Sequence, residues 1–278
     1  MIVTPGLTLI IFAAGVGAGG LGALLGLGGG IFLVPLLNLG LDFPMTTAAA
    51  ISLTTVIATS SAVSAARMGK QLINLRLGML LEVATAAGSL LGGVTAQFLP
   101  QSILQRLFGI VAFAVAAIMF ARSQRRNVIL DPSVDHGVLG GRFYEHESGG
   151  VVSYRVKRLP VAIAASFVAG NVSSLLGIGG GIIKVPVLNA WCGVPLRAAA
   201  ATSAFMIGVT ATAGAIIYYG HGQIIPVLAA AAVLGVQLGT WGGMHYSQRA
   251  SVKWLKLLMA ALLVIVSGLM FVRAARAA

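Results

Sequence analysis

Apolar blocks of about 20 residues or more follow one another along the chain, with short polar stretches between them. Four blocks fall in each half, at roughly 7–37, 45–66, 77–99 and 103–121, then 159–188, 196–219, 224–246 and 254–272. Helices of this length cross a bilayer, whereas the strands of a membrane barrel would alternate with a period of two. The pattern therefore predicts an all-α polytopic membrane protein.

The composition agrees with a lipid environment. Hydrophobic residues make up 58% of the chain and charged residues only 9%, whereas a soluble domain is about a quarter charged. Cys192 is the single cysteine, which excludes an intramolecular disulfide and a cysteine metal cluster. The sequence contains no P-loop, no metalloprotease motif and no Ser/His/Asp arrangement. We therefore expect no enzyme activity, no metal and no cofactor.

The charge balance is strongly basic, at +12 from 18 Lys+Arg and 6 Asp+Glu. Basic residues in short loops fix the orientation of a membrane protein, and no basic stretch here is interleaved with aromatic residues. We therefore predict the lipid bilayer as a partner and no nucleic acid. The stretch from Met1 to Leu9 has no basic start and no cleavage site, so it is expected to begin the first membrane segment. The predicted location is a bacterial-type inner membrane; small-residue faces permit a homodimer.

Two halves of the chain align without a gap after a shift of 151 residues. The shift superposes 24–30 on 175–181, and it aligns Pro35 with Pro186 and Met119 with Met270. Chance similarity between apolar stretches would not hold one register over about 100 residues. We predict a first repeat at 1–121, a polar cytoplasmic connector at 122–158 that includes a short hairpin strand at 151–156, and a second repeat at 159–278.

The basic loops change sides between the repeats. The loop between the second and third segments carries three basic residues, but its counterpart near Gly220 carries none; the next loop carries only Arg106, but its counterpart carries three. This favours inverted repeats, each with a first segment that breaks and returns to the side it entered. That arrangement puts 14 basic residues inside and 3 outside, against 12 and 5 for eight plain spans. Arg273 and Arg276 argue for the plain arrangement.

Each repeat has a run of glycines inside its first segment, at 26–30 and at 177–181. A glycine in a helix costs about 1 kcal/mol relative to alanine, and unwound backbone in hydrocarbon persists only where protein buries it or a wet cavity adjoins it. Amides at the start of the resumed helix attract anions. The runs thus predict a substrate site, and close helix packing is the alternative. The glycines assigned to the site are Gly28, Gly29, Gly30, Gly179, Gly180 and Gly181.

Small residues also recur four apart elsewhere, as in Gly15 with Gly19, Gly88 with Gly92 and Gly235 with Gly239. For these pairs we predict close helix packing.

Two ionisable residues lie inside apolar segments. Lys184 follows the second glycine run, and a cation there costs about 2.5–3.5 kcal/mol on insertion scales. Two interpretations stay open for Lys184: a counter-charge for a bound anion, or a side chain that snorkels to the interface. Glu82 is a candidate for proton coupling; pairing with Arg76 or an interfacial position is the alternative.

Neutral polar residues recur near the glycine runs. They could bind the oxygens of an anion, or cap helices and join them to one another. These candidates are Asn38, Ser52, Asn189, Thr202 and Ser203.

The duplicated motif G-x-G-G-G-x-x-x-x-P-x-L, from Gly26 to Leu37 and from Gly177 to Leu188, resembles the sulfite exporter TauE/SafE family, also called the toluene sulfonate uptake permease group. The resemblance covers nearly the whole chain. It implies a secondary carrier of sulfur-containing or organic anions such as sulfite, sulfonates, sulfoacetate or thiosulfate. From the two glycine runs in the repeats we predict alternating access around a site near the midplane. Neither the anion, the direction of transport nor the coupling ion follows from the resemblance.

Two other functions stay open. An anion channel would conduct without saturation at low substrate concentration. A non-transporting membrane scaffold would use the polar connector as its working surface.

Overall fold

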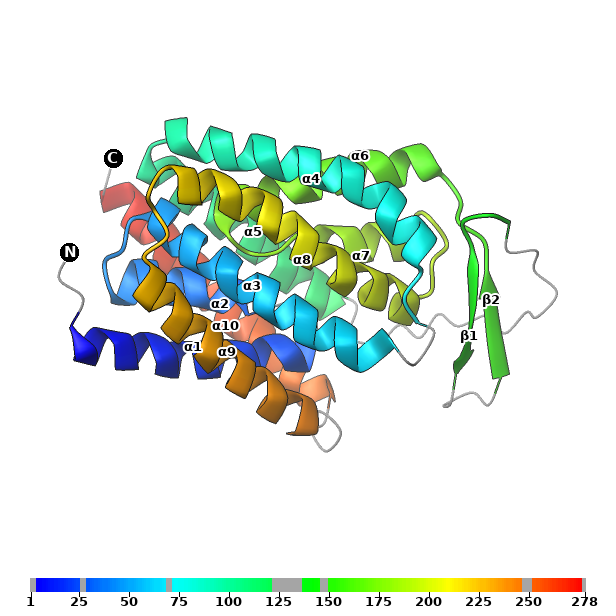
Figure 1. The fold of residues 1–278 in the computed structure, drawn as a ribbon, viewed down its shortest axis with the longest axis horizontal. Helices are drawn as coiled ribbons and strands as arrows, with labels where there is room; N and C mark the ends of the chain where they lie inside the picture. Colours follow the sequence, from blue (N-terminus) through cyan, green and yellow to red (C-terminus); the bar gives the residue numbers. More distant parts are fainter. Residues whose placement is uncertain are drawn as a thin grey trace.

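The computed structural model describes residues 4–25, 29–68, 72–121, 137–145, 150–246 and 252–276. These residues form a bundle of helices with a small two-stranded hairpin at one end (Figure 1). Seven of the described helices are long and apolar enough to cross a membrane, which confirms the predicted fold class. They are α1 (Pro5–Leu25), α3 (Met45–Met68), α4 (Leu75–Phe98), α5 (Gln101–Ala121), α6 (Leu159–Leu176), α8 (Leu196–Gly220) and α9 (Pro226–Tyr246).

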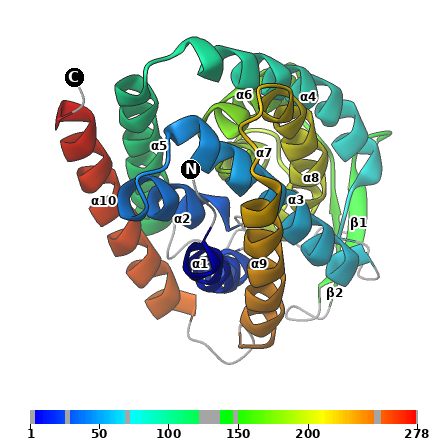
Figure 2. The same cartoon turned by 60° about the vertical axis from the view of Figure 1, so that its left-hand side comes forward.

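Shorter helices follow the two glycine runs. After the first run come α2 (Gly30–Pro35) and a π-helix, η1 (Leu36–Gly40); after the second comes α7 (Gly181–Ala190). At 1.5 Å per residue these pieces reach only about half of the roughly 30 Å hydrocarbon thickness. The apolar segments 7–37 and 159–188 are therefore each divided into one long and one short helix. The last helix, α10 (Val252–Arg276), lies beside α5 at the edge of the bundle (Figure 2).

The outer faces of the helices are apolar and exposed. Val83 and Trp241 are each 75% exposed and Phe98 is 82% exposed, whereas Lys184 and Glu82 are buried inside the bundle. A water-soluble protein would have the opposite distribution. The surface is therefore suited to lipid.

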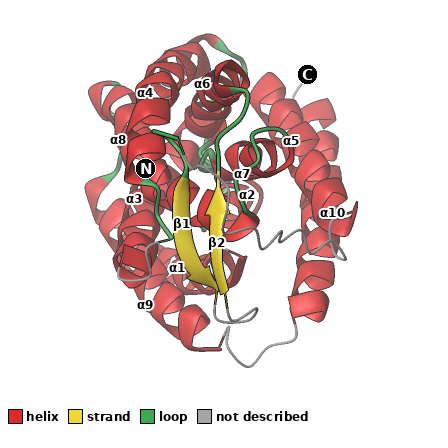
Figure 3. Ribbon diagram, turned by 90° about the vertical axis from the view of Figure 1, so that its right-hand side faces the viewer, coloured by secondary structure: helices red, strands yellow, loops and turns green. Residues whose placement is uncertain are grey.

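The hairpin closes one end of the bundle, called here the hairpin end. Strands β1 (Gly141–Glu145) and β2 (Gly150–Tyr154) pair antiparallel, which confirms a strand predicted in this part of the connector. Figure 3 views this end of the bundle, with the hairpin in front of the helices. Phe143 and Tyr154 are buried against Leu77 and Met206. The hairpin thus packs on the helices that carry the site described below.

Hydrogen bonds join the hairpin to the start of α4. Asn74, the N-cap of α4, accepts from Leu77 N–H and donates through Nδ2 to Leu139 O and to the Tyr154 hydroxyl. Burial raises the pKa of Tyr154, so the phenol stays protonated. The start of α4 therefore lies at the hairpin end.

The first broken segment begins and returns at the other end of the bundle. The side chains of Gln97 and Gln223 bond to each other, so the end of α4 and the start of α9 meet there. Helix α1 runs alongside α9 in the same direction (Figure 1), so it starts at this end too. After η1 the chain is back at this end, where Asp42 pairs with Arg273.

The second broken segment begins and returns at the hairpin end. Just before α6, Lys157 N–H donates to Cys192 O in the loop that follows α7 (2.9 Å). Helices α6 and α7 therefore form a re-entrant pair that opens at this end, whereas α1 and α2 form one that opens at the other.

Glycines let the long helices approach closely. Gly15 and Gly19 of α1 face Gly235 and Gly239 of α9, and a Cβ on Gly19 would overlap the Val236 carbonyl oxygen. Gly88 and Gly92 of α4 make the same kind of contact with the backbone of α6. The predicted packing role of the three glycine pairs is confirmed.

Two neighbouring glycines of α1 provide a matched test of this packing. We expect Gly19→Ala to destabilise the protein by about 1–3 kcal/mol, the usual cost of overpacking. Gly17→Ala should be neutral or stabilising by up to about 1 kcal/mol, because a Cβ there has open space. Thermal unfolding in detergent measures both. Equal stabilities of the two variants would contradict the close α1–α9 contact.

Candidate functional site: a buried ion pair beside two helix breaks

The two glycine runs meet in the interior of the bundle. Gly177 ends α6 in the left-handed conformation (φ 71°). Ser52 of α3 donates to the Gly177 carbonyl oxygen (2.6 Å), and a Cβ on Gly30 would lie only 2.6 Å from that same oxygen. The break between α1 and α2 therefore contacts the break between α6 and α7. Gly28 lies outside the described residues, whereas Gly29 is buried where α2 begins.

Lys184 lies one turn into α7, just beyond this meeting point. Its backbone N–H donates to Gly180 O, and the residue is only 1% exposed. Nζ donates to Thr210 Oγ1 of α8 (3.3 Å) and lies 3.9 Å from Glu82 Oε2 of α4. The side chain thus stays in the interior, so the snorkelling alternative is wrong.

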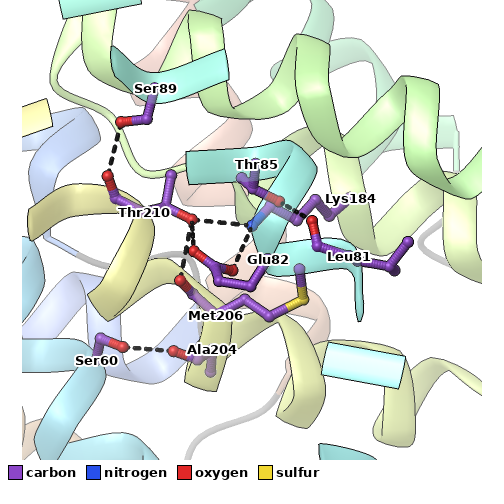
Figure 4. A network of polar contacts seen from close by, with 9 residues as sticks. All are labelled: Ser60, Leu81, Glu82, Thr85, Ser89, Lys184, Ala204, Met206 and Thr210. Atoms are coloured by element: carbon purple, nitrogen blue, oxygen red, sulfur yellow. Dashed lines mark hydrogen bonds and ion pairs between the residues drawn. The ribbon is translucent and has the colours of Figure 1, made fainter. Parts of the chain in front are cut away.

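Glu82 is buried at the same place, with 8% exposure. Its Oε1 accepts from the Thr210 hydroxyl (2.8 Å), so Thr210 connects the acid to the lysine (Figure 4). Of the described residues, Lys184 is the one that pairs with Glu82, so the alternative pairing with Arg76 is wrong.

The ion pair leaves hydrogen-bonding capacity unused. An ammonium group has three donors, and among the described residues Thr210 is the acceptor of one. Glu82 Oε2 has no hydrogen-bond partner there, and 3.9 Å to Nζ is too long for one. Desolvation of a buried pair costs several kcal/mol per ion. An incompletely satisfied pair inside a membrane bundle is therefore a candidate functional site.

Small residues and free hydroxyls surround the breaks. A Cβ on Gly180 would lie 3.2 Å from Lys184 Cε, and a Cβ on Gly181 would lie 3.2 Å from Ser203 Oγ. The hydroxyls of Ser203 and Ser173 are buried without a partner among the described residues. Gly179 has a positive φ of 74° just before α7. The surroundings of Lys184 thus combine buried glycine backbone in close contact with neighbouring helices and hydroxyl groups without a partner among the described residues.

Three predicted residues lie away from Lys184. Asn38 donates to Phe43 O (2.7 Å) and Asn189 donates to Val194 O (3.0 Å), and each bond spans a loop after a broken segment. Thr202 accepts from Asn74 N–H (3.0 Å) and joins α8 to the start of α4. Two roles were predicted for these residues: binding the oxygens of an anion, or capping helices and joining them. The observed bonds agree with the second role.

Thr210 is the part of the site that the sequence reading missed. It lies seven residues after Ser203, hence on the same face of a helix, and this polar spacing was the available signal. Its neighbours Thr85 and Ser89 on α4 bond to Leu81 O and Thr210 O. The Ser89 bond joins α4 to α8 beside the site, whereas the Thr85 bond lies within α4 (Figure 4).

The ion pair joins the two predicted repeats, Glu82 from the first and Lys184 from the second, and the residues that the repeat places opposite them are apolar. A shift of 151 residues places Leu33 opposite Lys184 and Val233 opposite Glu82. Leu33 is fully buried in an apolar cluster. Among the described residues, no group of three or more His, Cys, Asp or Glu could hold a metal ion.

Helices of membrane-spanning length, two re-entrant pairs and an interior ion pair define a multi-pass membrane protein of the transporter class. Comparison with known families gives the particular family: the profile described as Sulfite exporter TauE/SafE matches residues 11–270, and the chain belongs to that family.

Two curated relatives match almost end to end. The probable membrane transporter protein YunE of Bacillus subtilis (strain 168) is 25% identical, and the match covers 93% of this chain and 95% of the relative. The probable membrane transporter protein MJ0441 of Methanocaldococcus jannaschii is 26% identical, with 95% and 93% covered. No solved structure matches the chain. The chain is thus a membrane transporter, and its relatives are named as transporters, not as enzymes.

Proposed function

We propose that this transporter is a secondary carrier of small sulfur-containing or organic anions, of the sulfite, sulfonate, sulfoacetate or thiosulfate type. The observation that carries the proposal is the fully buried Lys184 beside the glycine break that starts α7. A lysine in this position is costly and supplies the positive charge that an anion needs.

Backbone amides add to this charge. The amides at the start of α7, from Gly179 to Gly181, carry the partial positive charge of a helix N-terminus. Ser203 Oγ is a further donor without a partner among the described residues. An oxyanion beside Lys184 would satisfy groups that protein atoms leave unsatisfied. The match to a family of sulfite exporters supports a sulfur oxyanion.

Alternating access follows from inverted repeats in this proposal. One re-entrant pair opens at the hairpin end and the other at the opposite end, while the breaks touch between them. In related halves, a contact between the first segment of one half and the third segment of the other should occur twice. It does so here, as α1 with α9 and as α6 with α4. Rocking of one repeat against the other would expose Lys184 to each side in turn.

The hairpin end is proposed to face the cytoplasm of a bacterial-type cell. The starts of α4, α6 and α8 lie there, and Arg76, Lys157, Arg158 and Arg197 are close to these starts. Basic residues concentrate on the cytoplasmic side of membrane proteins.

Uptake into proteoliposomes tests the proposed function. Labelled sulfite, thiosulfate and methanesulfonate are each offered over a range of concentrations, with and without a pH gradient. A carrier predicts saturable uptake of at least one of them. Flux that rises linearly with concentration would favour a channel. Absence of uptake of all three, in folded and inserted protein, would overturn the proposal and favour a scaffold.

A further inference from the structure

We propose that Glu82 is the proton-binding group of this site, and that the protein moves one proton together with one monovalent anion. This inference rests on the proposed function and adds the coupling ion and the charge of the substrate. It is carried by the position of Glu82, which shares Lys184 and Thr210 with the place assigned to the anion.

The site contains one positive and one negative group. Helices α6, α7 and α8 pack around Glu82: α6 has no ionisable residue, α7 has only Lys184, and α8 has Arg197 in its first turn and two tyrosines in its last. On α4 itself the other charged residue, Arg76, is exposed. Within the described residues Lys184 is thus the charge that faces Glu82, and their sum is zero.

An arriving anion competes with Glu82 for the same lysine. When the anion takes the ammonium group, the carboxylate keeps only the Thr210 hydroxyl among its described partners. An ionised carboxylate buried without a counter-charge is very unfavourable, and such a group takes up a proton instead. Binding of the anion therefore draws a proton onto Glu82, and release of the anion returns that proton.

Thr210 can satisfy both protonation states. Its Oγ1 lies 2.8 Å from Glu82 Oε1 and 3.0 Å from Met206 O one turn earlier in α8. With Glu82 ionised, the hydroxyl donates to the carboxylate. With Glu82 protonated, the acid donates to Thr210 and the hydroxyl turns to Met206 O. Only one O–H bond, on Glu82, forms or breaks in the exchange.

Charge neutrality selects the substrate. The empty site (Lys⁺, Glu⁻) and the loaded site (Lys⁺, protonated Glu, monoanion) both have zero net charge. A dianion would leave one uncompensated negative charge in the interior, which is costly. We expect methanesulfonate to have a kcat/KM at least tenfold above that of dianionic thiosulfate.

The test uses methanesulfonate, because the sulfonate stays ionised and cannot carry the proton itself, as sulfite can. Proteoliposomes contain a trapped pH-sensitive dye, and valinomycin with potassium sets the membrane potential. We expect inward methanesulfonate to acidify the interior with one proton per anion, at a rate that the potential does not change.

Glu82→Gln is the informative variant, since the amide is neutral like the protonated acid. It should exchange internal for external methanesulfonate within about threefold of the wild-type rate but lose proton-coupled net uptake. Asp42→Asn, an exposed acid near the opposite end, is the matched control and should keep the coupling.

The outcomes separate this inference from the proposed function. Saturable methanesulfonate uptake without acidification, uptake driven by the potential, or coupling retained in Glu82→Gln would each overturn the inference and leave the carrier intact. Absence of saturable uptake of methanesulfonate, sulfite and thiosulfate in the wild type would overturn the proposed function itself. If Glu82→Gln does not fold, the potential dependence of the wild type decides.

Discussion

Lys184→Met is expected to lower the initial rate of anion uptake at least about 100-fold. The variant removes the one positive side chain that faces Glu82 among the described residues, and loss of one partner of a buried charge pair costs about 3–5 kcal/mol. A factor of ten corresponds to 1.4 kcal/mol, so the rate should fall by about two to three and a half orders of magnitude if the anion pairs with Lys184 as Glu82 does. Labelled uptake into proteoliposomes measures the rate.

A second variant separates transport from stability. Lys184→Met alone leaves Glu82 buried without a counter-charge, and either ionisation or forced protonation of that acid costs free energy, so the thermal stability of the variant in detergent should also fall. The double variant Lys184→Met with Glu82→Gln removes both charges and should recover most of that stability. Uptake should stay absent in both. Uptake by the double variant near the wild-type rate would show that Lys184 serves only to neutralise Glu82.

Gly30→Ala is expected to lower uptake about tenfold or more and to destabilise the protein by about 1–3 kcal/mol. Its Cβ would lie 2.6 Å from Gly177 O and 2.7 Å from Ser52 Oγ. It would therefore push apart the two breaks where they meet. Rates in proteoliposomes and thermal unfolding in detergent measure the two effects.

Gly40→Ala is the matched control for this prediction. Gly40 ends the same broken segment, but a Cβ there has open space, so both stability and uptake should stay near wild type. A Gly30→Ala protein with normal uptake would contradict the proposal that the breaks line the transport site.

The fold was largely predictable because it follows from local patterns. Apolar block length identified the spans, and the glycine run at 177–181 marked where α6 ends and α7 begins. The stretch after Gly149 and Gly150 predicted one strand of the hairpin, which the structure has at Gly150–Tyr154. What the pattern did not give is where the hairpin docks, because this depends on how Phe143 and Tyr154 fit the ends of α4 and α8.

The site was predictable only in part. Lys184 and Glu82 were both conspicuous as charges in apolar segments, but about 100 residues separate them, and only the packing of α4 against α6 and α8 brings them together. Thr210 has no charge to mark it, and its role arises from the position of its hydroxyl between two charged groups. Asn38 and Asn189 illustrate the opposite case: their recurrence is accounted for by a loop that each repeat closes in the same way.

Counterflow in the wild-type protein tests the central claim, a carrier with a buried anion site, most directly. Proteoliposomes are loaded with a high concentration of unlabelled anion, and labelled anion is added outside at a low one. We expect internal anion to accelerate entry of the label, with a transient accumulation above the external concentration, and we expect Lys184→Met to show neither effect. Label that only equilibrates, at a rate independent of the internal anion, would contradict the carrier and indicate an open pore.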